Sequence, residues 1–310
     1  MKFLRVASAK LSDYLVGEIK KRGEYFDESQ ISTQEMEKAK NECEIIVASG
    51  AGKVEGSLIE SMPRLKLIAS YGVGFDGIDL EACKRRGVLV ANTPDVLNDD
   101  VADTAIALYL NCIRNFVNLN RYVKEGMWGK HAYDLATSAC GLKVGVVGLG
   151  RVGMEIAKRL TVLKSSVAYF SRHKKDVPYP YYDNLLALAR EADCLIIILS
   201  ASDETYHIVN AEVLEALGPE GYIINVARGS IIDTRALIDA LRNHKIKGAG
   251  LDVFEHEPNV EKELLELDNV VLSPHAGSAT NHSRTLMANL VLENIDSYMK
   301  TGQLVTPVVL

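Results

Sequence analysis

Three side chains that could perform acid–base and anion-binding chemistry each follow an apolar stretch in the C-terminal half of the chain. Arg228 lies in N-V-A-R-G-S, Glu257 in L-D-V-F-E-H-E-P and His275 in S-P-H-A-G-S. An arginine can bind a carboxylate through two parallel hydrogen bonds, and an imidazole can donate a proton to a carbonyl oxygen near neutral pH. Glu257 can favour the protonated form of His275, because an opposite charge stabilises an imidazolium.

Each of these side chains also has a simpler interpretation. Arg228 could form a surface ion pair, His275 could be a structural residue, and Glu257 could belong to a solvated acidic turn with Glu255 and His256. The position of all three side chains directly after apolar stretches favours a catalytic role over these simpler interpretations. The apolar stretches before them have the pattern of strands in an open parallel sheet, and ligands bind such sheets at the carboxyl ends of the strands.

A glycine-rich segment precedes all three. Gly148, Gly150 and Gly153 have the spacing G-x-G-x-x-G, after the apolar run K-V-G-V-V and before an amphipathic segment. In this context the spacing is typical of a dinucleotide-binding loop, in which the first glycine makes a tight turn, the second admits the pyrophosphate and the third packs the helix closely. The alternative is a βα turn that happens to be rich in glycine.

The residues after the next apolar run indicate which dinucleotide binds. NAD-binding loops of this kind place an acid about 20 residues further on, where it accepts hydrogen bonds from the ribose 2′-hydroxyl. This chain has Ser171, Arg172 and Lys174 there, and an arginine suits the 2′-phosphate of NADP. The sequence predicts NADP(H) as cofactor, with NAD(H) accepted at lower preference; a solvated basic turn is the alternative.

Strand-like and helix-like segments alternate along most of the chain and predict an α/β fold. One series of strands is expected at residues 44–49, 65–70 and 88–91, and a second at 143–149, 166–171, 194–200, 221–226, 247–253 and 269–273. Long helices are expected over 98–124 and 281–300. Alternation of this kind is typical of parallel sheets with helices on both faces.

The two series predict two Rossmann-like, doubly wound parallel-sheet domains with an interdomain cleft. The expected boundaries give a discontinuous, flavodoxin-like substrate-binding domain of residues 1–98 plus 285–310, and an inserted dinucleotide-binding domain of residues 99–284. The tail L-V-T-P-V-V-L is too short to form a domain and is expected to pack on the first one.

Composition narrows the class of protein. The chain has 310 residues, of which 47% are hydrophobic and 25% charged, as in globular domains. A net charge of −6 argues against nucleic acid as the main partner, and no apolar stretch approaches the roughly 20 residues of a membrane span. Five scattered cysteines without a C-x-x-C pair are expected to be buried thiols in a reducing, cytoplasmic location, with no metal site.

Taken together, these motifs resemble those of the D-isomer-specific 2-hydroxyacid dehydrogenases. The resemblance runs through S-Y-G-V-G-F-D-G-I-D (70–79), N-T-P-D-V-L-N-D-D-V-A-D (92–103) and G-L-G-R-V-G (148–153), and continues through the three segments that contain Arg228, Glu257 and His275. The segment Y-F-S-R-H-K-K (169–175) and the ending V-T-P-V-V are most similar to the NADPH-linked glyoxylate/hydroxypyruvate and hydroxyphenylpyruvate reductases.

The resemblance implies roles for individual residues. Arg228, Glu257 and His275 fall on the family's catalytic arginine, glutamate and histidine, and Arg228 and His275 also contact substrate. The backbone of Val73 and Gly74 would bind the substrate carboxylate. The remaining implied contacts are with the cofactor: Leu149, Gly150, Arg151 and Val152 at the pyrophosphate, Val226 and Ala227 beside the nicotinamide ribose, and Asp252 at the nicotinamide carboxamide.

The expected activity is NADPH-dependent reduction of a 2-keto acid to the D-2-hydroxy acid, in a homodimer formed through the cofactor domain. Reduction of 2-ketogluconate or hydroxyphenylpyruvate is an alternative, and a nucleotide-sensing, corepressor-like binding protein is an alternative of another class. Trp128 could reach a partner's site or be a core residue, and Tyr71 and Phe75 could shape the substrate pocket or belong to the core. Glu257 disfavours the formate dehydrogenases, and the absence of a regulatory extension disfavours the longer phosphoglycerate dehydrogenases.

Overall fold

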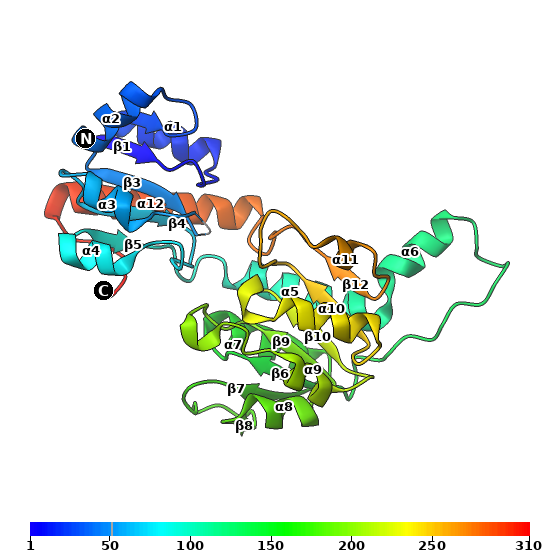
Figure 1. Ribbon diagram of the computed structural model, residues 1–310. Coiled ribbons are helices and arrows are strands. Elements are labelled where there is room, and N and C mark those ends of the chain that lie inside the picture. Colours follow the sequence, from blue (N-terminus) through cyan, green and yellow to red (C-terminus); the bar gives the residue numbers. More distant parts are fainter. Residues whose placement is uncertain (51) are drawn as a thin grey trace. The chain divides into compact units, whose positions relative to one another are not determined.

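A computed structural model describes residues 1–50 and 52–310 and contains two compact units (Figure 1). Unit 1 comprises residues 1–97 and 279–310, and unit 2 comprises residues 98–278. Residues 279–284, which were expected in the dinucleotide-binding domain, thus belong to unit 1. Thr280 caps the last helix through Ser283, whose hydroxyl donates to the carbonyl of Val96 at 3.2 Å.

Unit 1 is built on a parallel sheet that has five strands among the residues described. The strands are β1 (Lys2–Arg5), β2 (Glu24–Asp27), β3 (Ile45–Ser49), β4 (Leu67–Tyr71) and β5 (Leu89–Ala91). Their order, β2-β1-β3-β4-β5, is the flavodoxin-like order. The expected strands of this unit are confirmed as β3, β4 and β5, whereas β1 and β2 were missed because their short segments mix apolar and charged residues.

The helices of unit 1 are α1 (Asp13–Arg22), α2 (Thr33–Glu42), α3 (Gly56–Ser61), α4 (Leu80–Arg86) and α12 (Asn281–Thr301). The C-terminal tail lies beside β5, as expected: Val308 N–H donates to the carbonyl of Val90 at 2.8 Å, and Ala91 pairs with Pro307 in an antiparallel bridge.

Unit 2 is built on a parallel sheet with seven strands in the described chain. They are β6 (Lys143–Val147), β7 (Ser166–Phe170), β8 (Tyr181–Tyr182), β9 (Cys194–Ile197), β10 (Tyr222–Asn225), β11 (Gly248–Leu251) and β12 (Val270–Leu272). Read from β8, the order is β8-β7-β6-β9-β10-β11-β12. The first six strands have the 3-2-1-4-5-6 order of dinucleotide-binding sheets, and β12 extends the sheet beyond β11. The six expected strands are confirmed, and β8 is an additional two-residue edge strand.

The helices of unit 2 are α5 (Asn98–Arg114), α6 (Phe116–Lys124), α7 (Arg151–Val162), α8 (Leu185–Glu191), α9 (Ala211–Leu217), α10 (Thr234–Arg242) and α11 (Lys262–Leu265), with 3-10 turns η1 (Asp203–Thr205) and η2 (Gly229–Ile231). One continuous helix over 98–124 was expected. It is interrupted at Asn115, whose φ of 53° is left-handed, a conformation that asparagine tolerates better than most residues.

Alternating side chains of the unit 2 strands pack into two cores, one on each face of the sheet. Leu195 and Ile197 belong to the core covered by α8, α9 and α10, whereas Cys194 and Ile196 belong to the core covered by α5 and α7. This period of two explains why the strands appear in the sequence as continuous apolar runs. Both faces are covered, which leaves the strand ends as the places where polar side chains can gather.

Within the residues described, no helix has both the length and the apolar character that crossing a lipid bilayer requires. All five cysteines are free thiols. Cys43, Cys83 and Cys194 are buried, and burial raises the pKa of Cys43 to about 12 and of Cys83 to about 11. Cys112 is partly buried and Cys140 is exposed, so the expectation that all five would be buried is wrong for Cys140 and only partly met for Cys112.

Candidate functional site

The glycine loop joins β6 to α7, at the point where the strand order of unit 2 reverses. Gly148 has a φ of 108°, and a Cβ there would lie 2.7 Å from the carbonyl oxygen of Ile198. A Cβ on Gly153 would lie 2.1 Å from the carbonyl oxygen of Gly148, whereas one on Gly150 would meet no atom within 4 Å. Two glycines thus allow close backbone contact, and the middle one faces open space.

The open face at Gly150 coincides with the start of α7. The helical hydrogen-bond ladder begins with Met154 N–H donating to the carbonyl of Gly150 at 3.0 Å. The N–H groups of Arg151, Val152 and Gly153 precede that ladder and can bind an anion, which the helix dipole also favours. Leu149 is buried beneath the turn. The loop therefore fits a pyrophosphate.

The turn after β7 carries the basic residues that were expected at a 2′-phosphate. Arg172 and Lys174 are exposed, and neither forms an ion pair with any residue that the structure describes. The hydroxyl of Ser171 donates to the carbonyl of His173 at 2.6 Å, so it stabilises the turn itself. Both basic side chains lie beyond the carboxyl end of β7, where they add positive potential.

The turn after β10 is organised by Asn225, which is buried. Its amide nitrogen donates to the carbonyl of Arg228 at 2.9 Å, and its side-chain oxygen accepts the N–H of Ala227 at 3.0 Å. Val226 and Ala227 are buried, and the Arg228 guanidinium donates to the carbonyl of Ala227 at 2.8 Å. Asn225 was not among the expected site residues, although a polar residue at the end of a buried strand is a signal that could have found it.

Glu257 and His275 form a hydrogen-bonded pair. His275 Nδ1 lies 2.7 Å from Glu257 Oε2, and Glu257 Oε1 accepts the N–H of Phe254 at 3.0 Å. Burial raises the pKa of Glu257, but the hydrogen bonds from His275 and Phe254 and the positive charges of His275 and Arg228 outweigh it and lower the pKa overall. A carboxylate can only accept, so Nδ1 carries a proton and Nε2 is directed elsewhere.

Asp252 fixes the turn that carries His275. Its carboxylate is buried and accepts the N–H groups of Ala276 and Gly277, both at 2.8 Å, and its carbonyl accepts the N–H of His275 at 2.7 Å. His275 has a φ of 54°, an uncommon conformation for a residue with a side chain, and these three bonds hold it there. Both carboxylate oxygens thus serve the turn.

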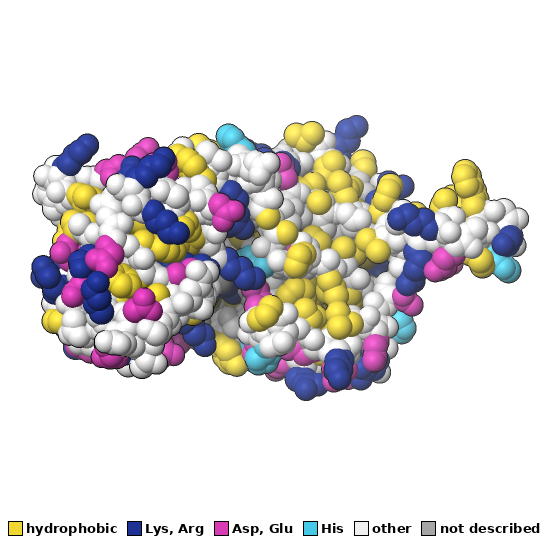
Figure 2. Space-filling model, turned by 90° about the horizontal axis from the view of Figure 1, so that it is seen from above, with side chains coloured by type: hydrophobic (Ala, Val, Ile, Leu, Met, Phe, Trp, Pro, Cys, Tyr) yellow, Lys and Arg dark blue, Asp and Glu magenta, His cyan; other side chains and the backbone are white. Residues whose placement is uncertain are grey.

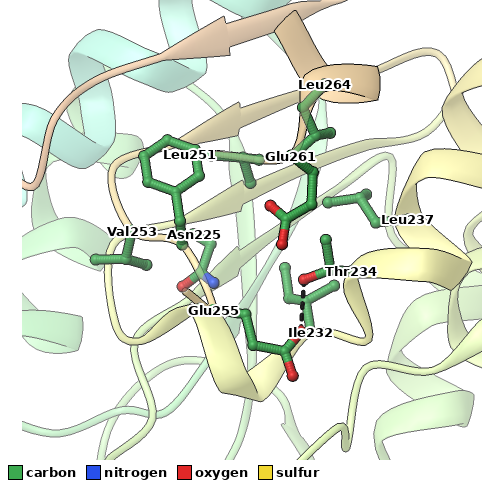
Figure 3. Close-up of a pocket in the computed structure, with 11 residues that line it drawn as sticks. Asn225, Ile232, Thr234, Leu237, Leu251, Val253, Glu255, Glu261 and Leu264 are labelled. Atoms are coloured by element: carbon green, nitrogen blue, oxygen red, sulfur yellow. Dashed lines mark hydrogen bonds between the residues drawn. The ribbon is translucent and has the colours of Figure 1, made fainter. Parts of the chain in front are cut away.

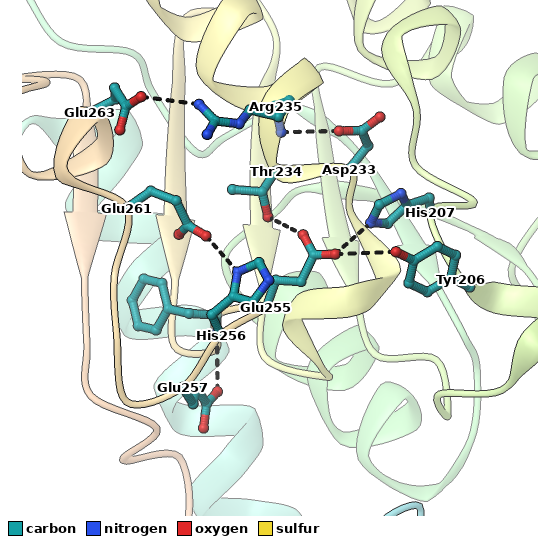
Figure 4. A network of polar contacts seen from close by, with 11 residues as sticks. Tyr206, His207, Asp233, Thr234, Arg235, Glu255, His256, Glu257, Glu261 and Glu263 are labelled. Carbon is teal, nitrogen blue, oxygen red and sulfur yellow. Dashed lines mark hydrogen bonds and ion pairs between the residues drawn. The ribbon is translucent and has the colours of Figure 1, made fainter.

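A second group of polar side chains surrounds Glu255 and His256 of the 254–257 turn (Figure 4). Glu255 accepts the hydroxyl of Thr234 at 2.7 Å and contacts His207 Nε2 at 2.8 Å, while His256 Nδ1 lies 2.9 Å from Glu261. Burial raises the pKa of Glu255, but the contacts with Thr234 and His207 lower it overall. Through the hydrogen bond between Thr234 and Glu255, the turn that carries Glu257 is held against the start of α10.

A small pocket adjoins this cluster (Figure 3). Glu255, Glu261, Thr234 and Asn225 line it together with apolar side chains of β11, α10 and α11. Arg228, Glu257 and His275 are not among its lining residues. The acid–base pair therefore lies outside this pocket.

Val73 and Gly74 lie in unit 1, in the turn after β4. A Cβ on Gly72 would lie 2.6 Å from the Cα of Gly50, so the two backbones approach closely there. Tyr71 is 2% exposed and its hydroxyl donates to the carbonyl of Arg284 at 3.0 Å, while Phe75 packs against the core of unit 1. Tyr71 is therefore a core residue.

Comparison with known proteins identifies the family. The sequence profile of the D-isomer specific 2-hydroxyacid dehydrogenase NAD binding domain matches residues 106–277. The chain is 41% identical over 302 residues to glyoxylate/hydroxypyruvate reductase A of Arabidopsis thaliana, covering 96% of each chain. This chain belongs to the D-isomer specific 2-hydroxyacid dehydrogenase family.

Other members of the 2-hydroxyacid dehydrogenase family are similar over most of the chain. Hydroxyphenylpyruvate reductase of Plectranthus scutellarioides is 43% identical over 265 residues, which is 85% of each chain. The crystal structure of an NADPH-dependent glyoxylate/hydroxypyruvate reductase from Sinorhizobium meliloti, in complex with NADP and malonate, superposes with a TM-score of 0.92 at 38% identity, covering 99% of this chain and 97% of that one. The expected family and fold class are confirmed.

Proposed function

We propose that this chain reduces a 2-keto acid of the glyoxylate/hydroxypyruvate type to the D-2-hydroxy acid with NADPH. The observation that supports this most is the contact of 2.7 Å between His275 and Glu257, with Arg228 close enough for its charge to act on the same carboxylate. A general acid held by a carboxylate, beside a guanidinium, suits a substrate that has a carboxylate next to a carbonyl.

His275 protonates the ketone oxygen from Nε2, because Glu257 occupies Nδ1. Glu257 stabilises the imidazolium that serves as the acid, and Arg228 binds the carboxylate and polarises the carbonyl. The N–H groups of Val73 and Gly74 receive the carboxylate; no described residue accepts a hydrogen bond from either group. When bound, NADPH supplies the hydride for C2 of the keto acid.

The residues proposed to hold the cofactor follow from the loop geometry. The N–H groups at the start of α7 bind the pyrophosphate over the open face of Gly150. Arg172 and Lys174 bind the 2′-phosphate, and NADH is used at lower preference because it lacks that group. Ser171 contributes its position in the turn, because its hydroxyl already donates to the carbonyl of His173. Val226 and Ala227 lie beside the nicotinamide ribose, and Asp252 lies near the carboxamide.

Steady-state rates with NADPH and with NADH test the function. Glyoxylate, hydroxypyruvate, hydroxyphenylpyruvate and 2-ketogluconate would be compared, since reductases of these acids are among the relatives. We expect rapid NADPH oxidation, fastest with glyoxylate or hydroxypyruvate. If NADPH binds but is oxidised with none of these acids, the proposal is refuted and a nucleotide-sensing protein is favoured.

We also propose a homodimer, formed by the arm of residues 116–136. In Figure 1, α6 and the segment after it extend away from the sheet of unit 2, and Figure 2 shows hydrophobic side chains on this arm. The exposed large hydrophobic residues of the arm are Phe116, Val117, Val123, Trp128, Tyr133 and Leu135, with exposed fractions from 49% to 95%. Apolar surface of this extent marks an interaction site.

Trp128 is 76% exposed, so it is not a core residue of the isolated chain, and we propose that it contacts the partner subunit. Sedimentation equilibrium of the wild type and of Leu135→Asp tests this. We expect a dimer that dissociates in the variant, and a monomeric wild type at micromolar concentration would refute the assignment. A cytoplasmic location, supported by five free thiols, completes the proposal.

A further inference from the structure

The N–H groups of Val73 and Gly74, which are proposed to donate hydrogen bonds to the substrate carboxylate, belong to successive peptide units. In a trans peptide the N–H and the carbonyl of the same unit point in opposite directions. Both units are trans. The direction of each N–H is therefore set by whatever holds the carbonyl on the other side, which is Gly72 C=O for the first unit and Val73 C=O for the second.

Both carbonyls are held by neighbouring residues after β5. Thr93 N–H donates to the carbonyl of Gly72 at 2.9 Å, and Asn92 Nδ2 donates to the carbonyl of Val73 at 2.8 Å. The first bond is a backbone bond that any residue at 93 except proline could make. The second depends on the Asn92 side-chain amide, and it directs the N–H of Gly74 away from Asn92.

Asn92 is itself fixed by the C-terminal tail. Thr306 Oγ1 donates to the carbonyl of Asn92 at 2.6 Å and accepts from Asn294 Nδ2 at 2.8 Å. Asn294, which is fully buried on α12, accepts the N–H groups of Val305 and Thr306 at 3.0 and 2.9 Å. A continuous chain of hydrogen bonds thus runs from α12 through the tail to the Val73–Gly74 peptide.

We propose that Asn92 is a positioning residue for substrate binding: it orients the Gly74 N–H toward the substrate carboxylate, and Thr306 of the tail holds Asn92 in place. This inference rests on the proposed function, in which Val73 and Gly74 bind that carboxylate. According to this inference, the C-terminal tail affects substrate affinity through contacts that all lie within unit 1.

The substitution Asn92→Asp tests this, because it keeps the shape of the side chain and replaces the donor with an acceptor that repels the Val73 carbonyl. We expect KM for the preferred 2-keto acid to rise at least tenfold, with kcat reduced by less than threefold at saturation. The Kd of oxamate, an unreactive 2-keto acid analogue, should rise in parallel on the NADPH-loaded enzyme. The Kd of NADPH should stay within twofold of wild type.

Asn41→Asp is the matched control, since Asn41 in unit 1 also donates its side-chain amide to a backbone carbonyl, that of Glu37 at 2.8 Å. We expect this variant to keep wild-type KM and oxamate affinity. In a second pair, Thr306→Val loses the hydroxyl and should raise KM several-fold, whereas Thr306→Ser keeps it and should stay near wild type. This pair decides the question if Asn92→Asp fails to fold.

The outcomes separate this inference from the proposed function. A wild type that reduces no 2-keto acid would refute the proposed function. An active wild type, combined with unchanged KM and oxamate affinity in Asn92→Asp, or with equal KM in the two Thr306 variants, would overturn the positioning role. Equal losses of oxamate and NADPH affinity would indicate a general structural defect and would also overturn it.

Discussion

Replacing Glu257 with glutamine removes the charge that holds the His275 imidazole and leaves the size of the side chain unchanged. Both carboxylate oxygens accept a hydrogen bond, one from His275 Nδ1 at 2.7 Å and one from Phe254 N–H at 3.0 Å. Glutamine has a single acceptor oxygen, so one of these donors loses its partner. If the amide oxygen faces Phe254, an NH₂ group faces His275 Nδ1, and it can donate only to an unprotonated nitrogen, which disfavours the imidazolium.

The size of the effect follows from that contact. The Glu257 side chain is 27% exposed, and a hydrogen bond to a charged group contributes about 1.5–3 kcal/mol. If the imidazolium is the acid in the transition state, kcat should fall roughly 10- to 150-fold. The loss should be smaller at acidic pH, because excess protons restore the imidazolium that the missing carboxylate no longer favours.

The assay is kcat for reduction at saturating keto acid and NADPH between about pH 5 and 9. In Glu257→Gln the fall in kcat with rising pH should begin at a lower pH than in the wild type. Glu261→Gln is the control, because it removes a similar contact, of 2.9 Å with His256, in the same segment. A kcat within threefold of wild type and an unshifted profile in Glu257→Gln would refute the acid–base assignment.

Three further predictions concern the cofactor and stability. Arg172→Asp should lower the ratio of kcat/KM for NADPH to that for NADH by on the order of a hundredfold, since it replaces attraction of the 2′-phosphate with repulsion; an unchanged ratio would exclude Arg172 from cofactor recognition. Gly150→Ala should weaken NADPH binding at an unchanged Tm, because its Cβ would meet no protein atom within 4 Å. Gly153→Ala should lower Tm as well, because its Cβ would lie 2.1 Å from the Gly148 oxygen. Equal Tm values for the two variants would contradict this prediction. The pKa of Glu255 is lowered in the folded state, so its stabilising contribution is complete above the ordinary value of about 4.3 and is lost as pH falls through the folded one. Calorimetry should therefore show Tm falling less steeply on acidification in Glu255→Gln, and parallel curves would argue against it.

The amino-acid sequence is sufficient to predict the fold class and the residues that lie at the strand ends. Apolar runs and the glycine spacing are local features. Backbone sterics and the period-two packing of strands convert them into a parallel sheet whose carboxyl ends carry Arg228 and Glu257. The unit 2 strands and the glycine roles were predictable for this reason. Short or mixed segments such as β1, β2 and β8 were not, because their pairing depends on a neighbouring strand.

The contacts between individual side chains, in contrast, depend on how the folded chain packs. Three contacts join residues that are far apart along the chain. Asn92 donates to the carbonyl of Val73, Thr306 donates to the carbonyl of Asn92, and Asp252 accepts the N–H of Ala276 in the turn that carries His275. The exposure of Trp128 and the internal hydrogen bond of Ser171 were likewise not visible in the sequence. Hydrogen bonds require placement within a few tenths of an ångström, and that precision arises only when the packed sheet fixes the backbone on both sides of a contact.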